Sequence, residues 1–94
     1  MRKPCPSMRD KKRPAVIFGE VLQELRLQRS LTQDQLAELA GTERSHISSL
    51  ERAERGPALA TIFSLADALN IPAGELIGLV AKRLNSAKHT SRSV

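Results

Sequence analysis

The sequence predicts an all-α fold of five short helices, because of its composition and the spacing of its apolar residues. Leu, Ala and Ile supply most of the apolar side chains, whereas the 94 residues include no Trp, no Tyr and two Phe. Such a composition suits helices, since strands favour aromatic and β-branched residues. The apolar positions recur at helical spacing, and Gly or Pro separates several of the runs. We therefore expect one five-helix domain over residues 15–84.

The first two helices are predicted from an apolar face and from a pair of capping residues. The face of the first helix, which should end near Arg29, comprises Phe18, Leu22, Leu25 and Arg26. In the second, Thr32 and Gln35 form a capping box, in which each side chain binds an otherwise unpaired backbone N–H. Gly41 should end this helix, since glycine adopts the left-handed conformation without penalty.

Three further helices complete the predicted domain. Thr42 can cap the third helix, which we expect over residues 43–52. A Gly-Pro pair at residues 56–57 separates it from the fourth helix, which should end at the Asn-Ile-Pro sequence of residues 70–72. The fifth helix is expected over residues 73–84.

Positive charge is concentrated at the two ends of the chain. Residues 1–14 hold six basic side chains and one acid, and residues 82–94 hold four basic side chains and no acid. Residues 15–81 hold five arginines and nine acids. We expect flexible basic tails at 1–14 and 85–94, which either bind a polyanion or keep a small protein soluble.

Several classes of protein are disfavoured. Cys5 is the only cysteine, so no internal disulfide can form, which fits a reducing cytoplasm. The chain shows neither a run of about 20 apolar residues nor a signal peptide, so we expect a cytoplasmic protein without membrane contact. His46 and His89 are far apart and no ligand cluster surrounds them, so no metal site is predicted. No catalytic grouping is evident, and we expect no enzyme activity, cofactor or small-molecule ligand.

Residues 33–52 meet the steric demands of a helix-turn-helix motif. Counting from Gln33, the fifth residue must be small where the two helices cross, and the ninth must allow the turn. The fifteenth and eighteenth must be apolar to hold the second helix against the core. These four positions are Ala37, Gly41, Ile47 and Leu50. The second helix of such a motif, here 43–52, enters the major groove of double-stranded DNA.

The outward face of the 43–52 helix supplies the predicted base contacts. Ser45, Ser49 and Arg52 point away from the buried side, with Arg44 and Ser48 beside them. Arg44 is the best candidate to read guanine, because a bidentate contact there contributes roughly 1–3 kcal/mol of discrimination. Ser45, Ser48 and Ser49 are further candidates for base contact.

Phosphate contacts are predicted from residues beside this face. Gln33 begins a helix, where an anion is favoured, and Arg52 and Arg55 lie where the duplex backbone would pass. His46 is a candidate phosphate contact, with a plain surface histidine as the alternative. Glu43 favours the start of its own helix and could also accept a hydrogen bond from cytosine.

Residues 18–77 resemble the Cro/repressor (Xre-type) helix-turn-helix family, which has the lambda-repressor-like fold. The matching stretches are 25–26, 31–33, 35–37, 40–41, 47–48, 50–52, Pro57, Leu69 and 75–76. The resemblance covers about two-thirds of the chain and implies a DNA-binding domain that acts as a two-fold dimer on a palindromic operator. It also implies a structural ion pair between Arg26 and Glu51. Residues 51–57 resemble the corresponding loop of restriction–modification controller proteins.

The sequence departs from the family pattern at three positions outside the DNA-facing set. Ala53 replaces the usual Gly, which would let the third helix continue for another turn. Ala58 replaces a Ser-like N-cap, a loss of about 1 kcal/mol. Pro72 replaces a polar cap before the fifth helix.

The fifth helix offers a surface for a second copy of the chain. We expect Leu79, Val80 and Leu84 to form a homodimer interface, although Ile77 and Val80 could instead belong to the core of one chain. Two alternative functions stay open. One is an antitoxin that binds both an operator and a toxin, and the other is a helix-turn-helix protein-interaction module without DNA binding.

Overall fold

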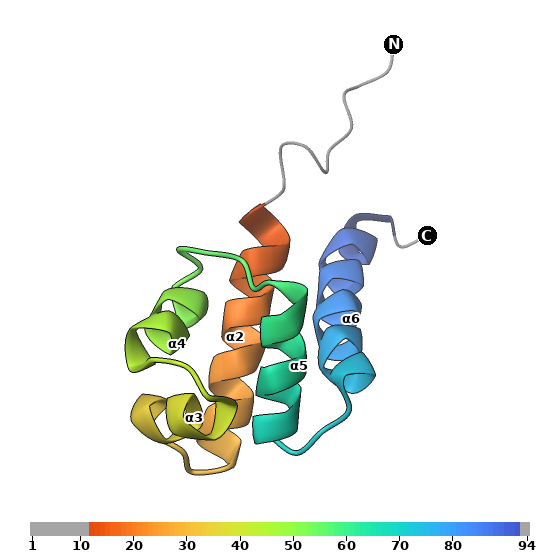
Figure 1. Cartoon of the computed structure of the whole chain (residues 1–94). Coiled ribbons are helices and arrows are strands. Elements are labelled where there is room, and N and C mark those ends of the chain that lie inside the picture. The colour runs from red at the N-terminus through yellow and green to blue at the C-terminus, as the bar shows by residue number, and fades with distance from the viewer. Residues whose placement is uncertain (1–11, 93–94) are drawn as a thin grey trace.

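The computed structural model describes the backbone of residues 12–92 and the side chains of residues 14–85. Within residues 12–92 the chain forms five helices and no strand, which confirms the predicted all-α fold (Figure 1). In chain order the helices are α2 (Lys12–Gln28), α3 (Gln33–Ala40), α4 (Arg44–Glu51), α5 (Leu59–Ala68) and α6 (Ala73–Arg92).

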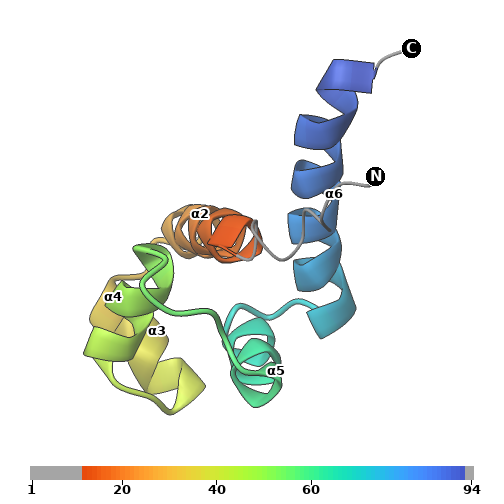
Figure 2. The same ribbon diagram turned by 90° about the horizontal axis from the view of Figure 1, so that it is seen from above.

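Helix α2 lies at the centre of the arrangement and contacts both α4 and α6. Helices α3 and α4 lie on one side of α2, and α6 lies on the other (Figure 2). Helix α5 contacts α3 and α6, so the five helices surround one core. The buried apolar side chains are Phe18, Val21, Leu22, Leu25, Leu36, Ala37, Ile47, Leu50, Leu65, Ala66, Leu69, Leu76 and Val80.

The start of α3 has the predicted capping box. The Gln35 backbone N–H donates to Thr32 Oγ1 at 3.0 Å, and the Thr32 backbone N–H donates to Gln35 Oε1 at 2.8 Å. Gly41 ends the helix with φ 73°, in the left-handed region. These local signals are satisfied within the helix termini themselves, so they could be identified without knowledge of the tertiary fold.

Helix α4 ends before Ala53, so the expectation that it continues for another turn is wrong. Ala53 has φ 61°, and the Glu54 backbone N–H donates back to the carbonyl of Ser49 at 2.9 Å. Ser30 and Asn70 have similar positive φ values after α2 and α5. Helices α2, α4 and α5 therefore end, like α3, in a left-handed turn, which at Ala53 is formed at the expense of Cβ strain.

Two helices are longer than the sequence predicts. Helix α2 begins at Lys12, before the predicted start of the domain, and α6 continues to Arg92, beyond the predicted end of the fifth helix. The α6 sequence beyond residue 78 contains no Gly or Pro that would stop a helix. Residues 1–11 and 93–94 lie outside the described part of the chain.

The N-cap of α4 is Glu43 and not Thr42, and neither side chain caps the helix. Thr42 Oγ1 instead lies 2.9 Å from His46 Nδ1. The start of α5 lacks a side-chain cap, as the presence of Ala58 predicts.

No single helix in the described residues is long and apolar enough to cross a membrane. The segments Leu59–Ala68 and Ala73–Asn85 reach that length and composition only together, with a bend of 106° between them. Both contribute side chains to the core, including Leu65 and Leu76.

Candidate nucleic-acid interface

Helix α4 is held against the core by its inner face and is open to solvent on its outer face. Ile47 and Leu50 are fully buried, as the motif predicts. Arg44, Ser45 and Arg52 are exposed, and the Arg44 side chain retains 63% of its accessible surface. The helix therefore presents polar and cationic groups to a partner without first having to unpack from its own domain.

Gly19 in α2 allows α4 to approach this closely. A Cβ atom at Gly19 would lie 2.6 Å from the carbonyl oxygen of Leu50 and 2.8 Å from that of Glu51. Both atoms belong to the backbone at the end of α4, so they cannot rotate away as a side chain would. The sequence analysis missed this residue, although a glycine inside a helical apolar pattern often marks close approach of two backbones.

Arg26 and Glu51 form an ion pair between α2 and the end of α4. Arg26 Nε donates to Glu51 Oε2 at 2.6 Å, and Arg26 Nη2 donates to Glu51 Oε1 at 3.1 Å. The two side chains retain 10% and 4% of their accessible surface. Arg26 Nη1 also donates to the carbonyl of Leu31 at 2.8 Å. This bidentate geometry restricts the rotation and tilt of α4 relative to α2.

Gln33 joins the same network from the first turn of α3. Its Nε2 donates to Glu51 Oε1 at 3.0 Å, so its side-chain amide is used within the protein. The predicted phosphate contact at Gln33 therefore competes with an internal hydrogen bond that local sequence spacing could not indicate, because Glu51 lies 18 residues away.

Two arginines of the outer face have acidic neighbours. Arg44 Nε lies 3.8 Å from Asp34 Oδ1 of α3. Arg52 donates to both carboxylate oxygens of Glu54, from Nε and Nη2, at 3.1 Å each. Exposed pairs of this kind contribute about 0–1 kcal/mol, so a more highly charged partner can displace either acid.

A shallow depression lies on one flank of α4. It has a volume of about 260 Å³ and is lined by Ser45, His46, Ser49 and Arg55. Ser45 is exposed, while His46 and Ser49 are half-buried. Ser48 is half-buried and does not line this depression. The structure thus brings together two predicted base contacts and two predicted phosphate contacts.

The structure places Val80 in the core of its own chain and not on the expected dimer surface. Its side chain is 8% exposed and belongs to the core of the same chain, because α6 packs that face onto α2. Leu79 and Leu84 are half-buried and pack against the core as well. Part of each leucine side chain stays accessible, so their contact with a second chain stays a prediction.

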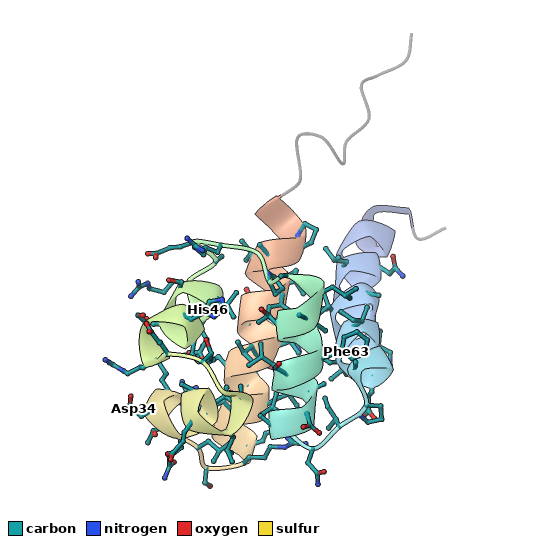
Figure 3. All side chains as sticks on the ribbon, viewed as in Figure 1. Asp34, His46 and Phe63 are labelled. Atoms are coloured by element: carbon teal, nitrogen blue, oxygen red, sulfur yellow. The ribbon has the colours of Figure 1, made fainter. Side chains whose placement is uncertain are left out.

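The exposed apolar side chains of this region lie instead on α5 and the outer face of α6. Leu59, Phe63 and Ile77 are 70%, 58% and 42% exposed. Phe63 also borders a shallow hollow that includes Ile71 and Ala73. Figure 3 shows Phe63 on the α5 and α6 side, whereas Asp34 and His46 lie over α3 and α4.

Arg83 connects α6 to α2 away from the α4 face. Its Nη1 and Nη2 donate to the two carboxylate oxygens of Glu24 at 3.1 and 2.9 Å. These hydrogen bonds lower the pKa of Glu24 and raise the pKa of Arg83. Among the described residues, no group of three His, Cys, Asp or Glu side chains could hold a metal ion.

Comparison with known proteins identifies relatives over the same segment. A helix-turn-helix family model, HTH_3, matches residues 22–76. The control protein C.SmaI of Serratia marcescens is 41% identical over 61 residues, which cover 65% of this chain and 73% of that protein. The transcriptional repressor RghR of Bacillus subtilis is 50% identical over 56 residues, or 58% of this chain and 42% of RghR.

A solved structure shows the same fold. The restriction-modification controller protein C.AhdI from Aeromonas hydrophila superposes with a TM-score of 0.64 and 44% sequence identity. The superposition covers 66% of this chain and 94% of C.AhdI. The similarity thus includes nearly all of C.AhdI and about two thirds of this chain.

Proposed function

Since this chain belongs to the helix-turn-helix family of the Cro/repressor type, we propose that it binds double-stranded DNA sequence-specifically, as a homodimer on a palindromic operator. Like its relatives among repressors and controller proteins, it is a DNA-binding transcriptional regulator and not an enzyme. Helix α4 enters the major groove in this proposal. The protein acts in the cytoplasm, where a bacterial regulator meets its DNA.

The outer face of α4 is the observation that carries the proposal. Ile47 and Leu50 fix the inner face in the core, while Arg44 remains 63% exposed on the outside. An α-helix with one buried face and one cationic, small-residue face fits the major groove, which is about 12 Å wide. The short side chains of Ser45 and Ser49 favour close approach to the base edges.

The proposed contacts divide into those that read sequence and those that position the protein. Base edges are read by Arg44, with Ser45, Ser48 and Ser49 beside it. Phosphates are bound by Gln33, Arg52, Arg55 and His46. The buried pair of Arg26 and Glu51 orients α4 and does not itself touch DNA. Arg52 has to exchange Glu54 for a phosphate, which is favourable because the exposed pair is weak.

The proposed dimer uses the α5 and α6 surface around Phe63. Leu59, Phe63 and Ile77 give a second copy an apolar surface on the side away from Asp34 and His46. The proposal requires a two-fold axis there that sets two α4 helices about 34–36 Å apart on one face of the duplex. One domain neutralises few phosphates, so doubling the site also strengthens binding.

Selection of bound fragments from random DNA tests the function directly. The proposal requires a pair of inverted half-sites whose centres lie one helical turn, or a multiple of it, apart. Arg44→Ala should weaken binding to the selected site and relax its sequence preference, whereas Arg55→Ala should weaken binding to all sequences alike. Equal losses on selected and random DNA for both variants would refute this division. Binding that is absent, or insensitive to salt, would favour a protein-interaction module.

The dimer surface has a matched pair of test variants. Phe63 and Leu27 are both 58% exposed, but Leu27 lies on α2, outside the α5 and α6 surface. Phe63→Asp should shift the protein towards monomer in sedimentation equilibrium and weaken operator binding, while Leu27→Asp should do neither. A dimer that survives Phe63→Asp places the interface elsewhere.

A further inference from the structure

Asp34 of α3 places a carboxylate beside Arg44, the side chain that is proposed to read a base. Arg44 Nε lies 3.8 Å from Asp34 Oδ1, and the two side chains retain 63% and 77% of their accessible surface. At this distance the groups are in electrostatic contact but are not hydrogen-bonded. Asp34 therefore limits where the guanidinium goes without holding it in one place.

The position of Asp34 relative to α4 is fixed by its neighbours in the first turn of α3. Thr32 and Gln35 hold each other in the capping box, through hydrogen bonds of 3.0 and 2.8 Å. Gln33 donates to Glu51, at the end of α4, at 3.0 Å. The residues on both sides of Asp34 are thus fastened, and one of them is joined directly to α4. Its carboxylate stays close to the start of that helix (Figure 3).

The ion pair involves one part of the Arg44 guanidinium. Nε faces the carboxylate, whereas Nη1 and Nη2 lie at the end of the side chain. These two nitrogens carry N–H groups that can donate together to O6 and N7 of guanine. A carboxylate near Nε thus favours an approach in which the end of the arginine side chain meets the base edge.

The charge of Asp34 distinguishes a base edge from a phosphate. A phosphate bound to Arg44 would lie close to the Asp34 carboxylate, and like charges repel at short range. O6 and N7 of guanine are uncharged acceptors, so guanine does not meet this repulsion. Displacing an exposed acid costs little, yet a carboxylate held in a helix stays nearby after it is displaced. Glu54, the acidic partner of Arg52, lies instead in the turn after α4.

We propose that Asp34 is a positioning residue for DNA recognition, which raises the selectivity of Arg44 for guanine and lowers its attraction to phosphate. The inference rests on the proposed DNA-binding function and gives a residue of α3 a part in its specificity. Selectivity of this kind comes in part from disfavouring the wrong contact. The free protein already contains the arrangement, so Arg44 would meet the duplex partly oriented.

The experiment measures binding of the full chain to its selected duplex and to duplexes that each carry one base-pair change. Arg44→Ala identifies the base pair that Arg44 reads. Asp34→Asn keeps the shape of the side chain and removes its charge. It should lower the preference at that base pair by about two- to fivefold, the range that an exposed ion pair provides. The preferences at the other base pairs should not change, and affinity for random DNA should rise.

Glu38→Gln is the matched control for the loss of an acid. Glu38 is exposed and lies one turn further along the same side of α3. Among the described side chains, no basic nitrogen lies within 4.0 Å of its carboxylate. Glu38→Gln should therefore leave the base preference unchanged. Asp34→Asn combined with Arg44→Ala should show the same preference as Arg44→Ala alone, because Asp34 acts through Arg44.

The outcomes separate this inference from the function on which it rests. An unchanged preference in Asp34→Asn, an equal loss in Glu38→Gln, or a loss that Asp34→Asn still adds to Arg44→Ala overturns the positioning role and leaves DNA binding intact. A lower free energy of unfolding with the preference retained also overturns it, and assigns the Asp34 charge to the first turn of α3 alone. A protein that binds no duplex contradicts the DNA-binding function itself.

Discussion

Replacing Gly19 with alanine should destabilise the domain, although alanine favours helices more than any other residue. In an exposed helix the change from Gly to Ala stabilises by about 1 kcal/mol. At Gly19 the new methyl group would lie 2.6 Å from the carbonyl oxygen of Leu50. An ordinary contact begins at 3.4 Å. The end of α4 must therefore move by roughly 0.8 Å, and overpacking of this kind costs about 1–3 kcal/mol.

The displacement acts where α4 is joined to α2. Glu51, whose own carbonyl oxygen lies 2.8 Å from the added methyl group, is the partner of Arg26 in the buried ion pair. Movement of that residue lengthens the 2.6 Å hydrogen bond and tilts the outer face of α4. We therefore expect Gly19→Ala to weaken operator binding in addition to reducing the free energy of unfolding.

Gly78 on α6 provides the matched control, since a Cβ added there meets nothing within 4 Å. Gly78→Ala should stabilise the protein by about 0.5–1 kcal/mol, so the two substitutions should have opposite signs. Urea denaturation followed by circular dichroism measures both free energies of unfolding. A Gly19→Ala protein as stable as Gly78→Ala would show that α4 does not approach α2 as closely as the structure indicates.

Three other predictions follow from individual contacts. Ala53→Gly should raise the free energy of unfolding by about 1 kcal/mol, because glycine removes the Cβ strain at φ 61°. Arg26→Met should lower the free energy of unfolding by about 3–5 kcal/mol, because it leaves the Glu51 carboxylate buried without its cation. An unchanged midpoint of denaturation would contradict this prediction. Because hydrogen bonds from Arg83 lower the pKa of Glu24, that pair should stabilise the fold above the ordinary carboxyl value of 4.5 and lose its effect as the pH falls below it. Arg83→Gln should therefore reduce the loss of stability on acidification, which an acid titration of the midpoint would detect.

Much of the fold could be predicted because its signals are local. Thr32 and Gln35 cap α3 through groups three residues apart, and Gly41 ends it through its own backbone preference. Ile47 and Leu50 were predicted to be buried because the helical period and the motif spacing both place them on the inner face. These features depend on short-range geometry, which a single sequence contains.

The remaining features depend on how the helices pack. Val80 is buried only because α6 lies with that face on α2, and the same apolar helix could have paired with a second chain. Gln33 reaches Glu51 across 18 residues. The backbone approach at Gly19 likewise depends on where the end of α4 packs against α2. Apolar periodicity shows which residues leave water and does not show what covers them.

The central claim is that the outer face of α4 meets DNA, and chemical-shift mapping tests it most directly. Amide resonances of the full chain would be followed as the selected duplex is added. We expect the largest changes at residues 44–49 and at Arg55, with small changes around Phe63. Changes confined to α5 and α6, with the α4 amides unmoved, would contradict the assignment of this face to DNA.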